Sequence, residues 1–295
     1  MGPVGVKICL LDHLKGKDKP NQISENAIDI IKKSDPPLLV ERSRLNHIKP
    51  GNLEDDFDEI KDADWVIEAV VERIDIKHKL YSQIDKVRSP NSIISSNTST
   101  IPLSILTQEM SDTLKADFSI THFFNPVRFM RLLEIVETPT MNKDKMSGLR
   151  DFCQNELGKG IVNCNDTPGF IGNRIGVYAM QVAMYEALER GLPVEIAAAL
   201  FGRPLGIPKT GVFGLYDLIG IDLMKDVLAS FKKELQENDP FMDVVSPHPL
   251  VEKLLEKGFN GNKGPGGFYQ TTTIGDDEIV KAMNTSDMSY YDFDK

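Results

Sequence analysis

Polar side chains gather at four places in the middle of the sequence. Two of these side chains, His122 and Glu134, could together act as a general base. The four places are Ser95–Ser99, Thr121–Pro126, Glu134 and Asp166–Asn173. His122 follows one apolar run and Glu134 stands inside the next, so we expect both side chains at one edge of a sheet. A buried carboxylate that bonds one imidazole nitrogen fixes the tautomer and makes the other nitrogen more basic. Such a pair could take the proton of an alcohol.

Each of these residues also has a plainer interpretation. A lone histidine such as His122 is more often a core residue with satisfied hydrogen bonds. Glu134 either faces solvent by strand alternation or is buried with a partner. Asp12 ends the apolar run Val6–Asp12 and suits the acid that binds the ribose hydroxyls in a dinucleotide-binding βαβ unit. It could also be an acid that simply ends a strand.

Apolar, β-branched runs alternate with helical spacing in the first part of the chain. The expected strands are Val6–Asp12, Trp65–Val71, Ser92–Ser96, Phe118–Phe123, Leu132–Glu137 and Ile161–Cys164. The expected helices are Asn21–Lys33, Ile74–Val87, a helix near Pro102–Met110, and Asn142–Leu157. This alternation predicts parallel βαβ units in an open α/β sheet.

The hydrophobic period changes at Asp166 and is helical from Phe170 onward. Helices are expected at Phe170–Arg190, Val194–Phe201, Leu215–Glu237, with a break at Gly220, and Pro249–Lys257. We therefore predict an α/β domain over residues 1–166 and an all-α domain over 167–270. Residues 271–295 are polar, acidic and weakly periodic, which predicts a tail.

Composition limits the classes of partner. The net charge of −10 argues against a nucleic-acid partner. We expect no membrane span, because no run approaches the ~18 apolar residues that one needs. Neither do the first residues have the pattern of a secretory signal. The three cysteines, Cys9, Cys153 and Cys164, lack metal-ligand spacing and suit a reducing compartment. We therefore expect a cytoplasmic protein without a metal.

Three motifs in order resemble those of the L-3-hydroxyacyl-CoA dehydrogenases of fatty-acid β-oxidation. They read SSNTST, THFFNPVRFMRLLEIVET and DTPGFIGNR. Their spacing agrees as well, with 23 positions from Ser99 to His122, 12 from His122 to Glu134 and 51 from His122 to Asn173. The resemblance runs from about Val4 to Gln270. The phrase GIPKTGVFGLYDLIGID is similar to the dehydrogenase part of the longer bacterial enzymes.

The resemblance implies a role for each of four residues in an NAD-dependent oxidation of an acyl-CoA. His122 would take the proton from the C3 hydroxyl while hydride passes from C3 to the nicotinamide. Glu134 would orient and polarise His122. Ser99 would bond the reacting oxygen and lie against the nicotinamide ribose, and Asn173 would contact the substrate carbonyl.

The resemblance also implies a set of cofactor contacts. These are Asp12, Val70, Val71, Glu72, Lys77, Ser99, Asn125 and Lys263. For Lys77 and Lys263 the plainer interpretation is a solvated lysine on a helix or loop. The helical domain would carry substrate contacts and could join two copies into a homodimer.

The sequence departs from the family at its beginning. The family starts with a strand, a G-x-G-x-x-G loop and a helix, whereas residues 4–12 match the family's segment after that helix. The loop lets the backbone approach a pyrophosphate, and the helix N-terminus supplies N–H donors. The missing strand is also central in the Rossmann order. We therefore expect an incomplete Rossmann-type sheet, and a non-catalytic remnant with impaired NAD binding is the alternative to an active dehydrogenase.

Overall fold

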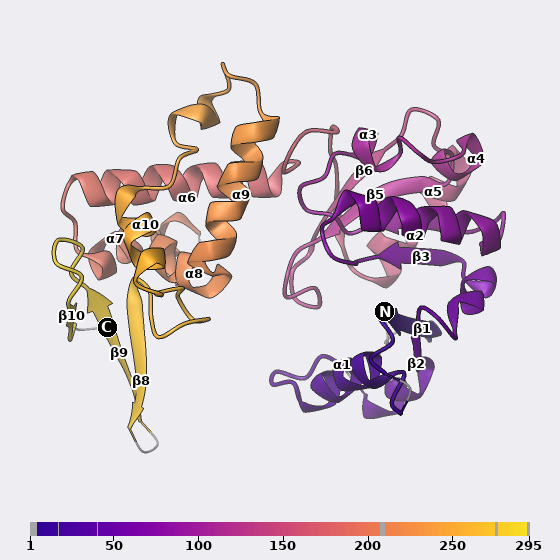
Figure 1. Cartoon of the computed structure of the whole chain (residues 1–295), viewed down its shortest axis with the longest axis horizontal. Helices are drawn as coiled ribbons and strands as arrows, with labels where there is room; N and C mark the ends of the chain where they lie inside the picture. Colours follow the sequence, from indigo (N-terminus) through magenta and orange to yellow (C-terminus); the bar gives the residue numbers. More distant parts are fainter. Residues whose placement is uncertain (1–4, 17, 40, 207–209, 275–276, 294–295) are drawn as a thin grey trace. The chain divides into compact units, whose positions relative to one another are not determined.

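The chain divides into two compact units, Met1–Phe170 and Ile171–Lys295. The computed structural model describes residues 5–16, 18–39, 41–206, 210–274 and 277–293 (Figure 1). The division falls slightly after the boundary expected at residue 166, because the ring of Phe170 is buried in the core of the first unit.

A five-stranded sheet forms the centre of the first unit, in the order β3-β4-β5-β6-β7. The strands are β3 (Trp65–Glu68), β4 (Ile93–Ser96), β5 (Phe118–Phe123), β6 (Leu132–Glu137) and β7 (Gly160–Asn163). The expected parallel pairing holds for β3, β4 and β5, and for β6 with β7, but β5 and β6 are antiparallel. The connection over residues 124–131 contains no helix and is too short for a parallel crossover.

Side-chain alternation divides the sheet into two apolar faces. Ile94, Phe118, Ile120 and Val136 belong to the core under α2 (Ile74–Val87), α3 (Leu103–Leu106) and α4 (Asp112–Lys115). The opposite core contains Ile93, Leu133 and Ile135 with α5 (Lys143–Asp151), which continues into one π-helical turn, Phe152–Glu156. Because alternate residues of a strand share a face, His122 and Glu134 both lie on the α2 face.

A separate two-stranded sheet holds the beginning of the chain. Strands β1 (Ile8–Asp12) and β2 (Ile48–Asn52) are parallel and are connected through helix α1 (Gln22–Lys33). The sequence did not predict β2, because it contains Pro50 and Gly51, which are depleted in strands. In the part of the chain that the structure describes, β1 and β3 belong to different sheets. The Rossmann-type sheet is therefore in two pieces, although Leu11 packs against the core below α2.

Five α-helices make up most of the second unit in the residues that the structure describes. They are α6 (Gly172–Glu189), α7 (Val194–Leu200), α8 (Gly211–Ile219), α9 (Ile221–Glu234) and α10 (Pro249–Glu256). The break expected at Gly220 separates α8 from α9. Gly220 has φ 102°, and a Cβ atom there would lie 2.5 Å from Lys263 Nζ. Glycine is therefore favoured at this corner by its conformation, whereas the flexible end of the Lys263 side chain could move away from a Cβ atom.

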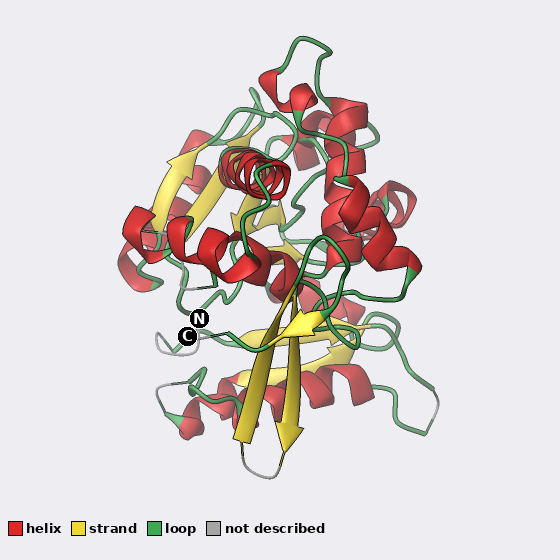
Figure 2. Cartoon of the chain, turned by 90° about the vertical axis from the view of Figure 1, so that its left-hand side faces the viewer, coloured by secondary structure: helices red, strands yellow, loops and turns green. Residues whose placement is uncertain are grey.

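The expectation of a polar tail after residue 270 is wrong. An antiparallel sheet of β8 (Tyr269–Ile274), β9 (Asp277–Met283) and β10 (Tyr290–Tyr291) occupies this segment (Figure 2). Met283 is completely buried in the core of the helical unit, and the Tyr291 hydroxyl donates to Glu195 of α7 at 2.7 Å. Ala282 and Met283 are adjacent and both buried, so this segment lacks the strict apolar–polar alternation that marks a half-buried strand.

Asp217 on α8 holds the loop that leads into β8. Its side chain is buried, with the residue 2% exposed, and accepts from the backbone N–H groups of Phe268 at 3.0 Å and Tyr269 at 2.7 Å. Burial raises the pKa of Asp217 to about 7, although these two hydrogen bonds act to lower it. A proton is therefore bound more tightly in the folded unit than in the unfolded chain.

We expect the stability of the second unit to fall as the pH rises from about 4 to about 7. The folded pKa of Asp217 lies above the unfolded value of about 3.9, so its contribution is complete below pH 4 and lost by pH 7. The loss would be about 4 kcal/mol at most. Hydrogen exchange of the α8 and α9 amides at pH 5 and pH 7.5 measures this slope. Asp217→Asn should flatten it, and a variant as pH-dependent as the parent would contradict the assignment.

Candidate active site

The His122 and Glu134 side chains face each other across β5 and β6. The two residues are direct partners in the antiparallel register. His122 Nδ1 lies 2.7 Å from Glu134 Oε2, and the side chains are 4% and 0% exposed. An ionised carboxylate can only accept, so Nδ1 carries the hydrogen and Nε2 keeps its lone pair. The buried pair therefore presents one basic nitrogen.

Ser99 supplies the hydroxyl that meets this nitrogen. Its Oγ atom lies 3.1 Å from His122 Nε2, in the turn that follows β4. Asn97 in the same turn accepts a hydrogen bond from the Phe123 backbone N–H at 2.9 Å. The turn is thus fastened to the end of β5, which keeps the hydroxyl and the imidazole in contact. An alcohol could replace the Ser99 hydroxyl at Nε2 or lie beside it.

Aromatic rings and a thiol surround the pair. The rings of Phe124 and Phe170 lie 4.5 Å and 5.5 Å from the His122 ring, centroid to centroid. Cys164, just after β7, donates to the second carboxylate oxygen of Glu134 at 3.7 Å. The sequence assigned no role to this cysteine, because its neighbours give no sign that the sheet brings it to Glu134.

Glu72 anchors the Ser99 turn from the side of β3. Its Oε1 atom accepts from the backbone N–H groups of Ser99 at 3.1 Å and Thr100 at 3.2 Å, and from the hydroxyl of Thr98. Burial acts to raise the pKa of Glu72, but the Thr98 hydrogen bond and the charge of Lys77 outweigh it, so the pKa lies below its usual value. Glu72 is therefore ionised at neutral pH.

Lys77 lies inside the unit rather than in solvent. Its side chain is 1% exposed, and Nζ contacts Glu68 at 2.7 Å and Glu72 at 3.1 Å. The interpretation of Lys77 as a solvated lysine is therefore wrong. A side chain buried in this way is poorly placed for a direct cofactor contact. We therefore keep Lys77 in the proposed site only as the residue that contacts Glu72. Glu68 was not predicted, although a glutamate within an apolar strand is the same signal that singled out Glu134.

Four other residues of the proposed cofactor set lie at strand ends in the first unit. Asp12 ends β1, and its carboxylate accepts from the His13 backbone N–H at 2.6 Å. The Val70 N–H donates to Glu68 at 2.7 Å, and Val71 is 52% exposed beyond β3. Asn125 is exposed after β5. Their contacts with a cofactor remain predictions.

The remaining two predicted residues belong to the second unit. Asn173 lies in the first turn of α6 and is half-buried. Lys263 Nζ lies 3.5 Å from Asp222 Oδ1, on the corner beside Gly220. Their approach to the His122 site stays a prediction.

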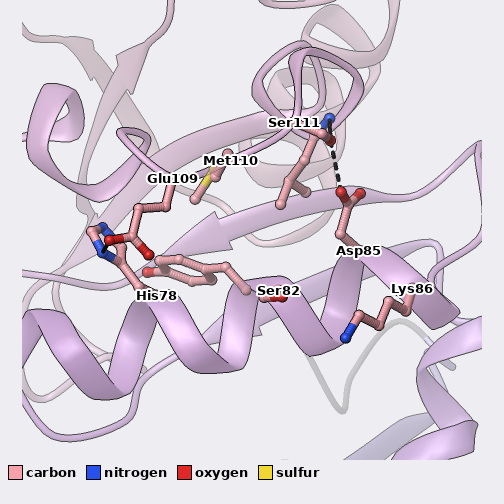
Figure 3. Close-up of a pocket in the computed structure, with 9 residues that line it drawn as sticks. His78, Ser82, Asp85, Lys86, Glu109, Met110 and Ser111 are labelled. Atoms are coloured by element: carbon pink, nitrogen blue, oxygen red, sulfur yellow. Dashed lines mark hydrogen bonds and ion pairs between the residues drawn. The ribbon is translucent and has the colours of Figure 1, made fainter.

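A separate pocket of about 240 Å³ opens between α2 and the segment that joins α3 to α4 (Figure 3). His78 and Glu109 lie at one end of it, and the Ser111 hydroxyl donates to Asp85 at 2.7 Å at the other. None of the residues predicted for the active site lines this pocket. We therefore place the chemistry at His122 and not in this pocket.

Glu134→Gln should lower kcat by about 10- to 100-fold, because a hydrogen bond to a charged partner is worth roughly 1.5–3 kcal/mol. The amide keeps the shape of the carboxylate but cannot stabilise a protonated imidazole as well. Steady-state kinetics with a 3-ketoacyl-CoA and NADH measure the effect, in a form of the chain with a G-x-G-x-x-G strand, loop and helix added. An unchanged kcat would show that Glu134 only fills space beside His122.

Family models match both units. The description "3-hydroxyacyl-CoA dehydrogenase, NAD binding domain" fits residues 4–167, and "3-hydroxyacyl-CoA dehydrogenase, C-terminal domain" fits residues 169–271. The chain belongs to the 3-hydroxyacyl-CoA dehydrogenase family. The sequence resemblance to this family is thereby confirmed, as is the order of a Rossmann-like unit followed by a helical unit.

Similar proteins and solved structures agree with this family membership. A Rickettsia felis protein named as the trifunctional enzyme of a fatty acid oxidation complex is 41% identical over 96% of this chain and 40% of its own length. A Bacillus subtilis protein named as a 3-hydroxyacyl-CoA dehydrogenase is 35% identical over 90% of this chain and 36% of its own. The (S)-3-hydroxybutyryl-CoA dehydrogenase structure from Ralstonia eutropha is 28% identical, covers 90% of both chains and has a TM-score of 0.69. The chain spans about 40% or less of the length of those two relatives.

The residues predicted to contact NAD address its sugars and its nicotinamide, but not its pyrophosphate. Ser99 and Glu72, whose carboxylate is partly exposed, are predicted to contact the nicotinamide side of the cofactor. The 295 residues contain no G-x-G-x-x-G sequence, and β1 and β3 belong to separate sheets in the described part of the chain. The turn that would hold the pyrophosphate is therefore not formed by these residues.

No helix among the described residues is long and apolar enough to span a membrane.

Proposed function

We propose that this chain is a dehydrogenase module that interconverts L-3-hydroxyacyl-CoA and 3-ketoacyl-CoA with NAD in fatty-acid β-oxidation. The observation that carries the proposal is the geometry of His122, whose Nδ1 faces Glu134 at 2.7 Å and whose Nε2 faces Ser99 at 3.1 Å. A basic nitrogen beside a hydroxyl group is the arrangement that alcohol oxidation needs.

Residues of this chain carry out the proton transfer. The C3 hydroxyl of the substrate donates to His122 Nε2, and Ser99 holds the same oxygen. NAD, when bound, would supply the acceptor for the hydride that leaves C3. The hydroxyl proton passes to Nε2, and the C3–O bond becomes a carbonyl. The resulting imidazolium lies against the Glu134 carboxylate, which stabilises its charge, and later returns the proton to water.

The finer assignments rest on the family resemblance. Asn173 would bind the substrate carbonyl. Asp12, Val70, Val71, Glu72, Asn125 and Lys263 would line the NAD site, with Lys77 acting through Glu72. The free thiols of Cys9 and Cys153 suit a reducing cytoplasmic location.

Homodimerisation through the helical unit belongs to the same proposal. Ile175, Leu200 and Leu218 are apolar side chains of α6, α7 and α8 that are 58–63% exposed. Apolar surface of this kind is typical of subunit contacts when it is contiguous. Light scattering on the purified chain would show whether it is a dimer.

A turnover assay with acetoacetyl-CoA and NADH tests the proposed activity. In a form of the chain with a glycine-rich strand, loop and helix added, we expect NADH oxidation that depends on the CoA group, with free acetoacetate as the control. Activity on acetoacetate alone would point to a dehydrogenase for another hydroxy acid. A chain that neither turns over nor binds NADH, even with a glycine-rich loop added, would be the non-catalytic remnant.

A further inference from the structure

Glu68 is the centre of a buried polar cluster that the proposed reaction does not use. Its carboxylate is 0% exposed. Oε1 accepts from Lys77 Nζ and the Val70 N–H, both at 2.7 Å. Oε2 accepts from the hydroxyls of Tyr81 at 2.5 Å and Ser96 at 2.6 Å. Four donors fill the roughly four acceptor positions of a carboxylate, so Glu68 has no capacity left for a substrate.

The cluster continues from Glu68 to the turn that carries Ser99. Lys77 Nζ bonds Glu68 on one side and Glu72 Oε2 on the other, at 3.1 Å. The second oxygen of Glu72 accepts from the Ser99 and Thr100 backbone N–H groups. A continuous chain of hydrogen bonds and ion pairs thus runs from β3, through α2, to the residue that meets His122.

We propose that Glu68 is a positioning residue: it fixes Lys77, which holds Glu72 in place under the turn, so that Ser99 meets His122. The inference rests on the proposed function for its catalytic consequence, whereas the ordering of the turn can be measured without turnover.

The charges explain why a carboxylate is needed at position 68. Lys77 carries one positive charge between two carboxylates and is screened from water. If Glu68 loses its charge, Glu72 becomes the one carboxylate of the three-residue chain that can balance the buried ammonium. Charge-assisted bonds are stronger than neutral ones, so Glu72 would be drawn toward Lys77 and away from the Ser99 and Thr100 N–H groups.

The test compares Glu68→Gln with two matched variants. Gln keeps the size of the side chain and removes its charge. Tyr81→Phe removes one donor but leaves the Glu68 charge in place. Asp117→Asn removes a different buried acid of the first unit, which pairs with Arg88 at 2.8 Å and Lys145 at 2.6 Å and takes no part in the cluster.

Amide hydrogen exchange is the main readout. In Glu68→Gln we expect the Ser99 and Thr100 amides to exchange at least about tenfold faster relative to the β5 amides, because their bonds to a charged acceptor weaken. Tyr81→Phe and Asp117→Asn should leave that ratio within about threefold. In an active form of the enzyme, Glu68→Gln should also lower kcat about tenfold with little change in KM for acyl-CoA.

Each outcome decides the proposal. Unchanged Ser99 and Thr100 exchange in Glu68→Gln, or the same selective increase in Asp117→Asn, would overturn it. If Glu68→Gln does not fold, Lys77→Met is the second variant. It breaks the Glu68–Lys77–Glu72 contacts at the lysine and should give the same selective increase in Ser99 and Thr100 exchange. Selective exchange in a chain that shows no turnover, even with a glycine-rich strand, loop and helix added, would reject the proposed function and keep the positioning role.

Discussion

His122→Gln is expected to lower kcat by about 10²–10⁴-fold, the range typical of a lost general base. The Gln amide can still bond Glu134, whose carboxylate lies 2.7 Å from Nδ1, but it has no nitrogen that can accept a proton at neutral pH. The assay is oxidation of a 3-hydroxyacyl-CoA by NAD. It should use a form of the chain with a G-x-G-x-x-G strand, loop and helix ahead of residue 4, because that form is expected to bind the cofactor.

His78→Gln is the matched control. His78 is on α2 of the same unit, and its Nε2 contacts the Ile105 carbonyl oxygen at 3.0 Å, away from Glu134 and Ser99. Its kcat should stay within about threefold of the parent, because it does not contact the reacting atoms. A near-normal kcat in the His122 variant would refute the assignment of the general base.

The 295-residue chain is expected to bind NADH at least about a thousandfold more weakly than a typical micromolar site, with a millimolar dissociation constant or worse. The two pyrophosphate charges would meet no glycine-rich turn, in a protein of net charge −10. A missing helix terminus costs about 0.3–2 kcal/mol. Several lost charge-assisted hydrogen bonds cost roughly 1.5–3 kcal/mol each, which brings the total to about 5 kcal/mol or more.

Calorimetric titration with NADH measures this affinity directly. The form with the added strand, loop and helix is the control and should bind in the micromolar range. The separation of β1 and β3 into different sheets adds to the expected loss, because the Rossmann order places between them the strand that leads into the glycine-rich loop. A low micromolar constant for the chain by itself would mean that other residues replace the glycine-rich loop.

The sequence by itself determined the features that depend on local pattern. Helix α2 has the predicted bounds Ile74–Val87, and strands β5 and β6 have the predicted bounds Phe118–Phe123 and Leu132–Glu137. Strong periodicity makes such elements readable, because each buries one face against the rest of the fold. The motifs around Ser99, His122 and Glu134 were sufficient to identify the family.

Tertiary structure decided whatever depends on pairing between distant residues. The antiparallel register that puts His122 opposite Glu134 arises from a short connection, and no local pattern shows it. The three-stranded sheet after residue 268 forms because Met283 reaches the helical core. The fully buried Glu68–Lys77 pair contradicts the ordinary preference of both side chains for solvent. A carboxylate and an ammonium can be buried in this way only when the fold supplies donors and a counter-charge from other elements, and these meet only after folding.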